Sequence, residues 1–259
     1  MSYSRTDLFG IYPGSPVSQA YTRHSPSKLN LYAAQPAMWW LENIKGIKQP
    51  VGAVAHRGVA VEEGVVLGLL KPDEDDKVCV QVAQSRYDQL TVLSGDPRRD
   101  KYRADIPDMV AMALDELRPL GVPSDTQGFI TWQPEGLRLP IVGYFDFAWA
   151  DQGLIIDLKT TDRMPSDIKV GHARQVSLYA SDNMQGRLTY ATPKKVQTLQ
   201  LENIREHRQA LLNIAKRVEA FMALSEDPEF GKTIFAPDLD SFYWTNPAAR
   251  QLAFEQWGI

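Results

Sequence analysis

Two aspartates and a lysine lie in two β-prone runs that a short polar turn separates. Asp146 belongs to the run 143–149, and Asp157 and Lys159 belong to the run 154–161. Two such runs around a polar turn predict a β-hairpin. Paired carboxylates can bind a divalent cation, and a neighbouring ammonium group can stabilise negative charge on a phosphate. The residue types therefore suit metal-assisted phosphodiester chemistry.

The turn decides which of these side chains face each other. If Trp149 pairs with Leu154, Asp146 lies opposite Asp157, with their Cβ atoms about 5 Å apart. Lys159 then shares that face, because side chains two residues apart in a strand point the same way. Facing carboxylates are destabilising unless a cation neutralises them. A turn shifted to Gln152-Gly153 would instead pair Asp146 with Lys159 as an ordinary cross-strand ion pair.

Two predicted helices offer further groups. The first, residues 54–70, carries Glu62, which could supply a third acidic ligand or be an ordinary surface acid. The second, residues 167–181, carries Gln175 and Tyr179, whose spacing of four places them on one helical face. Gln175 could orient a water molecule or a phosphate, and Tyr179 could donate to a phosphate, although half-buried Gln and Tyr residues are common.

The remaining pattern predicts a mixed α/β domain around a central sheet. Residues 1–24 are expected to form a loosely held arm, and residues 25–259 a single domain with a C-terminal helix and an aromatic tail. Further helices are expected after Ser25 and after Pro36 and over 106–117 and 200–224. Strands are expected over 78–82, 129–132, 137–149, 154–160 and 187–192.

Composition limits the classes of protein that fit. The chain has 259 residues, a formal net charge of −4 and one cysteine, Cys79. A single cysteine excludes an internal disulfide and a multi-cysteine metal or iron–sulfur site, and it suits a reducing cytoplasm. No secretory h-region and no apolar run of membrane-spanning length is visible, so we expect a soluble cytoplasmic protein. The negative charge argues mildly against sequence-blind coating of nucleic acid.

An ordered set of motifs resembles the PD-(D/E)XK nucleases. The set comprises Glu62, Gly-x-x-Asp at 143–146, Ile-Asp-Leu-Lys-Thr at 156–160 and Gln-x-x-x-Tyr at 175–179. It is most similar to the RecB, Cas4 and lambda-exonuclease branch. This resemblance implies that the protein comes from a phage or a bacterium. The resemblance implies a restriction-endonuclease-like core, in which a central mixed sheet is flanked by helices.

The same resemblance implies roles for these residues. It implies that Mg²⁺ or Mn²⁺ is bound by Glu62, Asp146, Asp157 and the carbonyl of Leu158. Lys159 would position or activate the attacking water, and Gln175 and Tyr179 would contact that water or the DNA backbone. Members of this branch often carry a cysteine where this chain has Gln35, so no iron–sulfur cluster is expected.

The expected function is a metal-dependent DNA nuclease, with exonuclease action favoured, in recombination, repair or phage genome processing. Candidate contacts to the DNA backbone are Arg57, Lys169, Arg174 and Lys194. A recombinase, a single-strand-binding protein or a helicase could be a partner, and the chain could form a homo-oligomer. Two alternatives stay open: a non-cleaving DNA-binding or complex-forming module with the same fold, and an unrelated α/β protein with a surface ion pair.

Overall fold

A mixed five-stranded sheet organises the larger part of the protein. In the computed structural model, which describes residues 16–180 and 183–259, the chain divides into two compact units. The larger unit comprises residues 51–130 and 143–208, and the smaller one residues 1–50, 131–142 and 209–259. No helix among the described residues is both long and apolar enough to cross a membrane.

The strands of the large sheet run in the order β1, β4, β5, β6, β7. Only the β5–β6 pair is parallel, and the other neighbours are antiparallel. The strand bounds are β1 Asp125–Thr126, β4 Phe147–Trp149, β5 Leu154–Thr160, β6 Gln185–Ala191 and β7 Val196–Gln200. The helices of this unit are α4 Ala53–Leu70, α5 Asp76–Leu90, α6 Arg99–Leu117 and α7 Val170–Tyr179, with short 3₁₀ turns η2 Arg118–Leu120 and η3 Ala150–Gln152.

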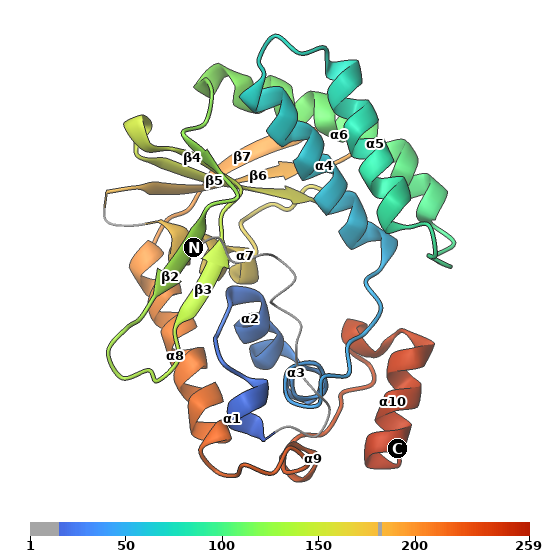
Figure 1. The fold of residues 1–259 in the computed structure, drawn as a ribbon, viewed down its shortest axis with the longest axis vertical. Coiled ribbons are helices and arrows are strands. Elements are labelled where there is room, and N and C mark those ends of the chain that lie inside the picture. The colour runs from blue at the N-terminus through green and yellow to red at the C-terminus, as the bar shows by residue number, and fades with distance from the viewer. Residues whose placement is uncertain (1–15, 181–182) are drawn as a thin grey trace. The chain divides into compact units, whose positions relative to one another are not determined.

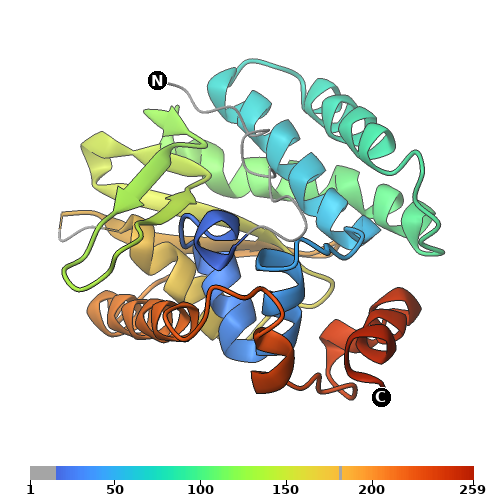
Figure 2. The same ribbon diagram turned by 60° about the horizontal axis from the view of Figure 1, so that its bottom comes forward.

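Strand β5 separates the apolar core from the polar site by simple alternation. Leu154, Ile156 and Leu158 are buried in one cluster with residues of α4, α5 and α6. Asp157 and Lys159 alternate with them and therefore lie on the opposite face, where α7 packs against β5 and β6. Figures 1 and 2 show α4, α5 and α6 together on one side of this sheet and α7 on the other.

Small residues let α4 approach its neighbours closely. A Cβ atom on Gly64 would lie 2.7 Å from the backbone oxygen of Cys79 in α5, so a larger residue there would force the helices apart. A Cβ on Gly58 would lie 3.3 Å from the hydroxyl of Thr160 at the end of β5. The fixed position of α4 carries Glu62 toward the edge of the sheet.

The smaller unit is built from helices and includes part of a hairpin. Its own elements are α1 Val17–Ala20, α2 Pro26–Ala34, α3 Pro36–Asn43, α9 Gly231–Ile234, η4 Phe242–Trp244 and α10 Pro247–Trp257. The chain passes between the units within β2 Phe129–Trp132, β3 Ile141–Tyr144 and α8 Ile204–Met222. Strands β2 and β3 form a separate two-stranded sheet.

A buried polar chain ties this unit together. His24 is fully buried, and its Nδ1 lies 3.1 Å from the hydroxyl of Tyr21 while its Nε2 lies 3.2 Å from Glu219. Glu219 also accepts hydrogen bonds from the backbone N–H groups of Arg138 and Leu139, at 2.9 and 2.8 Å. The expected loose arm lies partly outside the described residues, but from Val17 to His24 the segment is packed, with Val17, Ala20, Tyr21 and His24 buried.

The predicted helices 54–70 and 167–181 and the helices after Ser25 and Pro36 are confirmed as α4, α7, α2 and α3, although α7 is shorter than predicted and spans Val170–Tyr179. The helix expected over 106–117 begins earlier, at Arg99. The predicted strand over 78–82 is wrong, because these residues lie in α5. Cys79, Ala83 and Tyr87 are its buried positions, four residues apart, and Asp75 caps it by accepting from the N–H of Lys77.

Two other boundaries differ from the expectation. The strand predicted over 137–149 is two strands, β3 and β4, because the chain departs from strand geometry at Phe145 and Asp146. The helix predicted from residue 200 begins at Ile204, since residues 196–200 form β7 and pair with β6. Gln200 therefore pairs with β6 at the edge of the sheet instead of beginning the helix.

Candidate active site

The hairpin of β4 and β5 has the register that brings the two aspartates together. Phe147 pairs with Ile156, and Trp149 pairs with Leu154. The turn consists of η3 and Gly153, whose φ of 60° is the left-handed conformation that glycine tolerates best. This register confirms the first of the two turns considered and rules out the one that pairs Asp146 with Lys159.

Asp146 lies just before β4, and its carboxylate turns toward β5. Its Oδ2 accepts a hydrogen bond of 2.7 Å from the backbone N–H of Leu158. The backbone oxygen of Asp146 accepts from the N–H of Gln127 at 2.9 Å. The side chain is therefore held against the backbone between Asp157 and Lys159, and only 9% of the residue is exposed.

Asp157 is fully buried and stands at the centre of a polar network. Its Oδ2 lies 2.5 Å from Nζ of Lys159. Its Oδ1 accepts a hydrogen bond of 3.2 Å from the amide of Gln175 on α7. The same amide donates to the hydroxyl of Tyr179 at 3.0 Å. The structure thus brings together Asp146, Asp157, Lys159, Gln175 and Tyr179.

The electrostatics of the cluster follow from two buried carboxylates beside a single ammonium group. Burial, then the charges of Asp157 and Glu62, raise the pKa of Asp146 well above its ordinary value. Burial also raises the pKa of Asp157, although Lys159 opposes the shift. Burial alone would lower the pKa of Lys159, but Asp157 and Asp146 outweigh it and the net shift is upward. The cluster is short of positive charge, and a further cation would stabilise it.

Glu62, on α4, is close enough to this cluster for its charge to raise the pKa of Asp146. Its Oε1 accepts a hydrogen bond of 2.8 Å from the side chain of Gln127. Among residues 16–180 and 183–259, no group of three His, Cys, Asp or Glu side chains is arranged to hold a metal ion. The donor set still fits a hard divalent cation, because Asp146 and Asp157 present carboxylate oxygens beside an excess of negative charge. Glu62 would have to move closer to join them.

The four residues expected to contact DNA have different surroundings. Lys169, just before α7, and Lys194, just after β6, are exposed. Arg174 is half-buried on α7 and makes contacts of its own. Arg57 is fully buried, and its guanidinium donates to Asp162 at 2.8 Å and to Asp105 at 3.1 Å. The expectation for Arg57 is therefore corrected, since its guanidinium already binds two protein carboxylates.

Two residues beside Lys159 were missed from the sequence. Tyr190 pairs with Lys159 across β5 and β6, and its hydroxyl lies 2.9 Å from Nδ1 of His172 on α7. Burial, then the charges of Lys159 and Lys169, lower the pKa of His172 to about 4. His172 lies three residues before Gln175, so helical spacing could have indicated that it shares the face of Gln175 and Tyr179.

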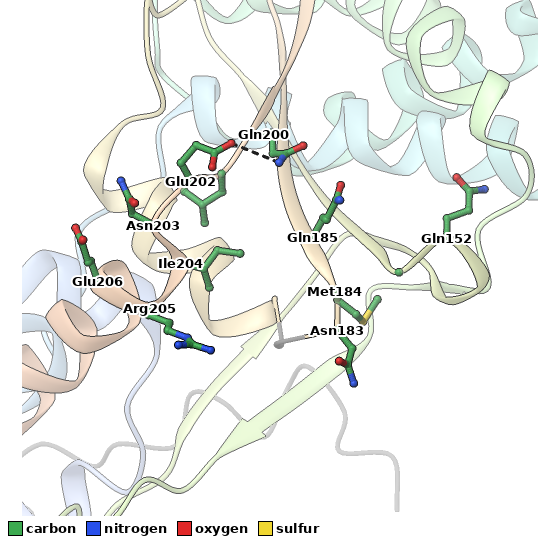
Figure 3. Close-up of a pocket in the computed structure, with 12 residues that line it drawn as sticks. Gln152, Asn183, Met184, Gln185, Gln200, Glu202, Asn203, Ile204, Arg205 and Glu206 are labelled. Atoms are coloured by element: carbon green, nitrogen blue, oxygen red, sulfur yellow. Dashed lines mark hydrogen bonds between the residues drawn. The ribbon is translucent and has the colours of Figure 1, made fainter.

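A separate hollow lies at the other end of the same strands. Its volume is about 680 Å³, and its lining includes the amide side chains of Gln152, Asn183, Gln185, Gln200 and Asn203. Figure 3 shows these side chains around the start of β6 and the end of β7. Asp157 and Lys159 lie toward the end of β5 and do not line it.

Comparison with known proteins agrees with this geometry. The family model of the PD-(D/E)XK nuclease superfamily matches residues 23–244. The chain belongs to the PD-(D/E)XK nuclease superfamily. Its mixed sheet with flanking helices confirms the predicted restriction-endonuclease-like α/β fold.

One solved structure matches the chain at low sequence identity. A solved structure titled "Crystal structure of SSO0001" is 15% identical and matches with a TM-score of 0.36. The match covers 74% of this chain and 95% of that one. No curated protein matches the sequence significantly.

Proposed function

We propose that this protein is a metal-dependent deoxyribonuclease of the RecB, Cas4 and lambda-exonuclease branch, acting as an exonuclease in recombination, repair or phage genome processing. The observation that carries the proposal is the assembly of Asp146, Asp157 and Lys159 with Gln175 and Tyr179 around one buried point. A surface ion pair would not bury two aspartates against a single lysine.

Residues on β5 and its neighbours would hold the metal. Asp146, Asp157, the carbonyl of Leu158 and, after rearrangement, Glu62 are the proposed ligands of Mg²⁺ or Mn²⁺. Such an ion lowers the pKa of a bound water and clamps the scissile phosphate.

The protein's own groups would prepare the reaction. Lys159 carries a firmly held positive charge, since its pKa is raised, and would stabilise negative charge that develops on the phosphate. Gln175 fixes Asp157 and Tyr179 relative to each other. Exposed Lys169 and Lys194, with Arg174, are the proposed contacts to the DNA backbone.

Digestion of defined substrates tests this function. Linear duplex, circular duplex and single-stranded DNA, with an RNA strand for comparison, would be incubated with Mg²⁺ or Mn²⁺. We expect cleavage of linear DNA that chelation abolishes and that falls by at least about 100-fold in Asp157→Asn and in Lys159→Ala. Asp151→Asn is the matched control, because Asp151 is an exposed aspartate in the turn of the same hairpin.

The substrates also separate the alternatives. Sparing of circles identifies an exonuclease. DNA binding by folded wild-type protein without cleavage of any substrate in either metal contradicts the proposal and favours the non-cleaving module. Equal cleavage by wild type and both site variants would assign the activity to a contaminant and also contradict it.

A further inference from the structure

Two aromatic rings are exposed together at the junction of β2 and β3. Phe129 is 48% exposed and Tyr144 is 37% exposed. Their ring centroids are 5.1 Å apart, with an angle of 50° between the planes. Most other large aromatic residues of this unit, such as Phe147, Trp149 and Tyr190, are buried. An exposed pair of π-faces is therefore an unusual feature of this unit and a candidate contact surface.

The backbone joins this aromatic pair directly to the proposed active site. The N–H of Phe145, next to Tyr144, donates to the oxygen of Gly128, next to Phe129, at 3.1 Å. One residue further along, the N–H of Gln127 donates to the oxygen of Asp146 at 2.9 Å. Phe129 and Tyr144 therefore lie on the same two chain segments, 127–129 and 144–146, whose backbone hydrogen bonds position Asp146.

Side chains of the site hold the same segments in place. The side chain of Gln127 binds Glu62. The backbone of Tyr144 hydrogen-bonds the hydroxyl of Tyr179, which is bound in turn to Gln175. Because Tyr144 is two residues from Asp146, their Cα atoms are at most about 7 Å apart. Tyr144 and Asp146 can therefore contact the same short stretch of a DNA strand.

The chemistry of the pair selects one occupant. Aromatic rings have no charge to bind phosphate, but they stack on the face of any base that is not already paired and stacked in a duplex. We propose that Phe129 and Tyr144 stack an unpaired base of the DNA strand whose phosphate enters the Asp146–Asp157 site. The substrate class is then single-stranded DNA or a frayed duplex end. This inference rests on the proposed nuclease function.

Binding and cleavage of matched DNA molecules test the inference. A single-stranded oligonucleotide and a relaxed, covalently closed circular duplex, each containing 2-aminopurine, would be titrated with protein in Ca²⁺ and then cleaved in Mg²⁺ or Mn²⁺. Loss of one stacked base predicts single-strand binding that is roughly 5- to 100-fold weaker in Phe129→Ala and in Tyr144→Ala. The circular duplex, which offers no unpaired base, should bind all proteins within about 2-fold.

Three further variants separate stacking from damage to the fold. Phe129→Leu keeps the apolar bulk and should bind as poorly as Phe129→Ala, whereas Tyr144→Phe keeps the ring and should restore most of the binding lost in Tyr144→Ala. Val78→Ala is the surface control, because Val78 is 38% exposed on α5, which packs on α4 and α6. Thermal unfolding checks that every variant folds.

Each outcome bears on one of the two proposals. If the wild type cleaves DNA and the aromatic variants match it on single strands, the stacking inference is overturned and the nuclease stands. Equal loss on single strands and on the circular duplex, or full binding by Phe129→Leu, also overturns stacking. If the wild type cleaves nothing but binds single strands through Phe129 and Tyr144, the nuclease proposal fails and the stacking inference is supported.

Discussion

The carboxylate of Asp146 is held by the backbone N–H of Leu158, at 2.7 Å, rather than by a side chain. Leu158 itself turns into the apolar core with the residues of α4 and α6. Leu158 therefore holds Asp146 through its backbone N–H and packs in the apolar core through its side chain. The anchor keeps Asp146 beside Asp157, although the pKa of both carboxyl groups is raised by burial. The site therefore stores unfavourable electrostatic energy that a bound cation would relieve.

Asp146→Asn should make the metal-free protein more stable while abolishing cleavage. The pKa of Asp146 is raised in the folded state, so above pH 3.8 the unfolded chain ionises more readily and folding is penalised. Asparagine removes this penalty and can still accept from Leu158. We expect the free energy of unfolding in EDTA to rise by at least about 1 kcal/mol, measured by urea denaturation at pH 7.5.

Metal and a second variant serve as controls for that result. Mg²⁺ or Mn²⁺ should stabilise the wild type, because a ligand that binds only the folded state stabilises it. The difference in the free energy of unfolding between Asp146→Asn and the wild type should therefore become smaller. Asp151→Asn should change neither stability nor the response to metal. A loss of stability in Asp146→Asn would show that the carboxylate contributes more through its hydrogen bond than it costs through its charge.

Gln175 and Tyr179 should act as a unit. The amide of Gln175 donates to both Asp157 and the hydroxyl of Tyr179. Gln175→Ala and Tyr179→Phe should each lower the free energy of unfolding by about 1 kcal/mol and lower kcat. In the double variant the losses should fall short of additivity by about 0.5–1 kcal/mol. Additive losses in stability and in kcat would contradict a shared network.

Local chemistry in the sequence was enough to predict the hairpin and the polar cluster. Trp149 pairs with Leu154 as the β-prone runs and the turn suggested, and this fixes which face Asp157 and Lys159 occupy. Gln175 and Tyr179 lie four apart on a helix, so their common face was also predictable. These are relations within one hairpin or one helix, where spacing dictates geometry.

Relations between distant segments were not predictable in this way. The pattern around Cys79 alternates over five residues, yet the buried residues recur every fourth position through Tyr87, and packing against α4 decides in favour of a helix. Arg57 looks like a surface cation until Asp105 and Asp162, which are 48 and 105 residues away, enclose it. Gln127 and Glu62 are hydrogen-bonded to each other but lie 65 residues apart in the sequence, so no local pattern predicted their contact.

The contribution of His24 and His172 to stability should fall as the pH drops from 7 to 5, because both side chains resist protonation in the folded state. The raised pKa of Asp146 and Asp157 acts in the opposite direction, so the histidine contribution is the difference between the wild type and the histidine variants. Burial lowers the pKa of His24, and it lowers the pKa of His172 to about 4. Below the ordinary value of 6.5 the unfolded chain binds protons that these folded residues do not, so stability is lost until the pH reaches the folded pKa. We expect about 1–2 kcal/mol to be lost for His172 between pH 7 and pH 5.

Urea denaturation at pH 7, 6 and 5 measures this slope. His172→Asn and His24→Asn should each flatten it relative to the wild type, whatever their effect at pH 7. Glu219, whose pKa is lowered by the N–H groups of Arg138 and Leu139 against the effect of burial, adds a further loss only below about pH 4.5. An unchanged slope in both histidine variants would contradict the prediction.

Arg57 should support the fold, whereas Lys194 should support DNA binding. The guanidinium of Arg57 is fully buried, ion-paired with Asp105 and Asp162, and lies over the ring of Tyr102 at 4.8 Å. Arg57→Ala removes the cation that Asp162 and Asp105 share, although Asp105 keeps Lys101 at 3.2 Å, and because Asp162 is half exposed we expect a loss of about 2–4 kcal/mol. Lys194→Ala removes only an exposed charge, so its stability should stay within about 0.5 kcal/mol of the wild type.

The salt dependence of DNA affinity should change in Lys194→Ala and not in Arg57→Ala. Lys194→Ala should lower the magnitude of the slope by about 1, as expected for one lost phosphate contact, while Arg57→Ala, assayed where it is folded, should keep the wild-type slope. A reduced slope in Arg57→Ala would mean that its guanidinium leaves its protein partners to meet a phosphate.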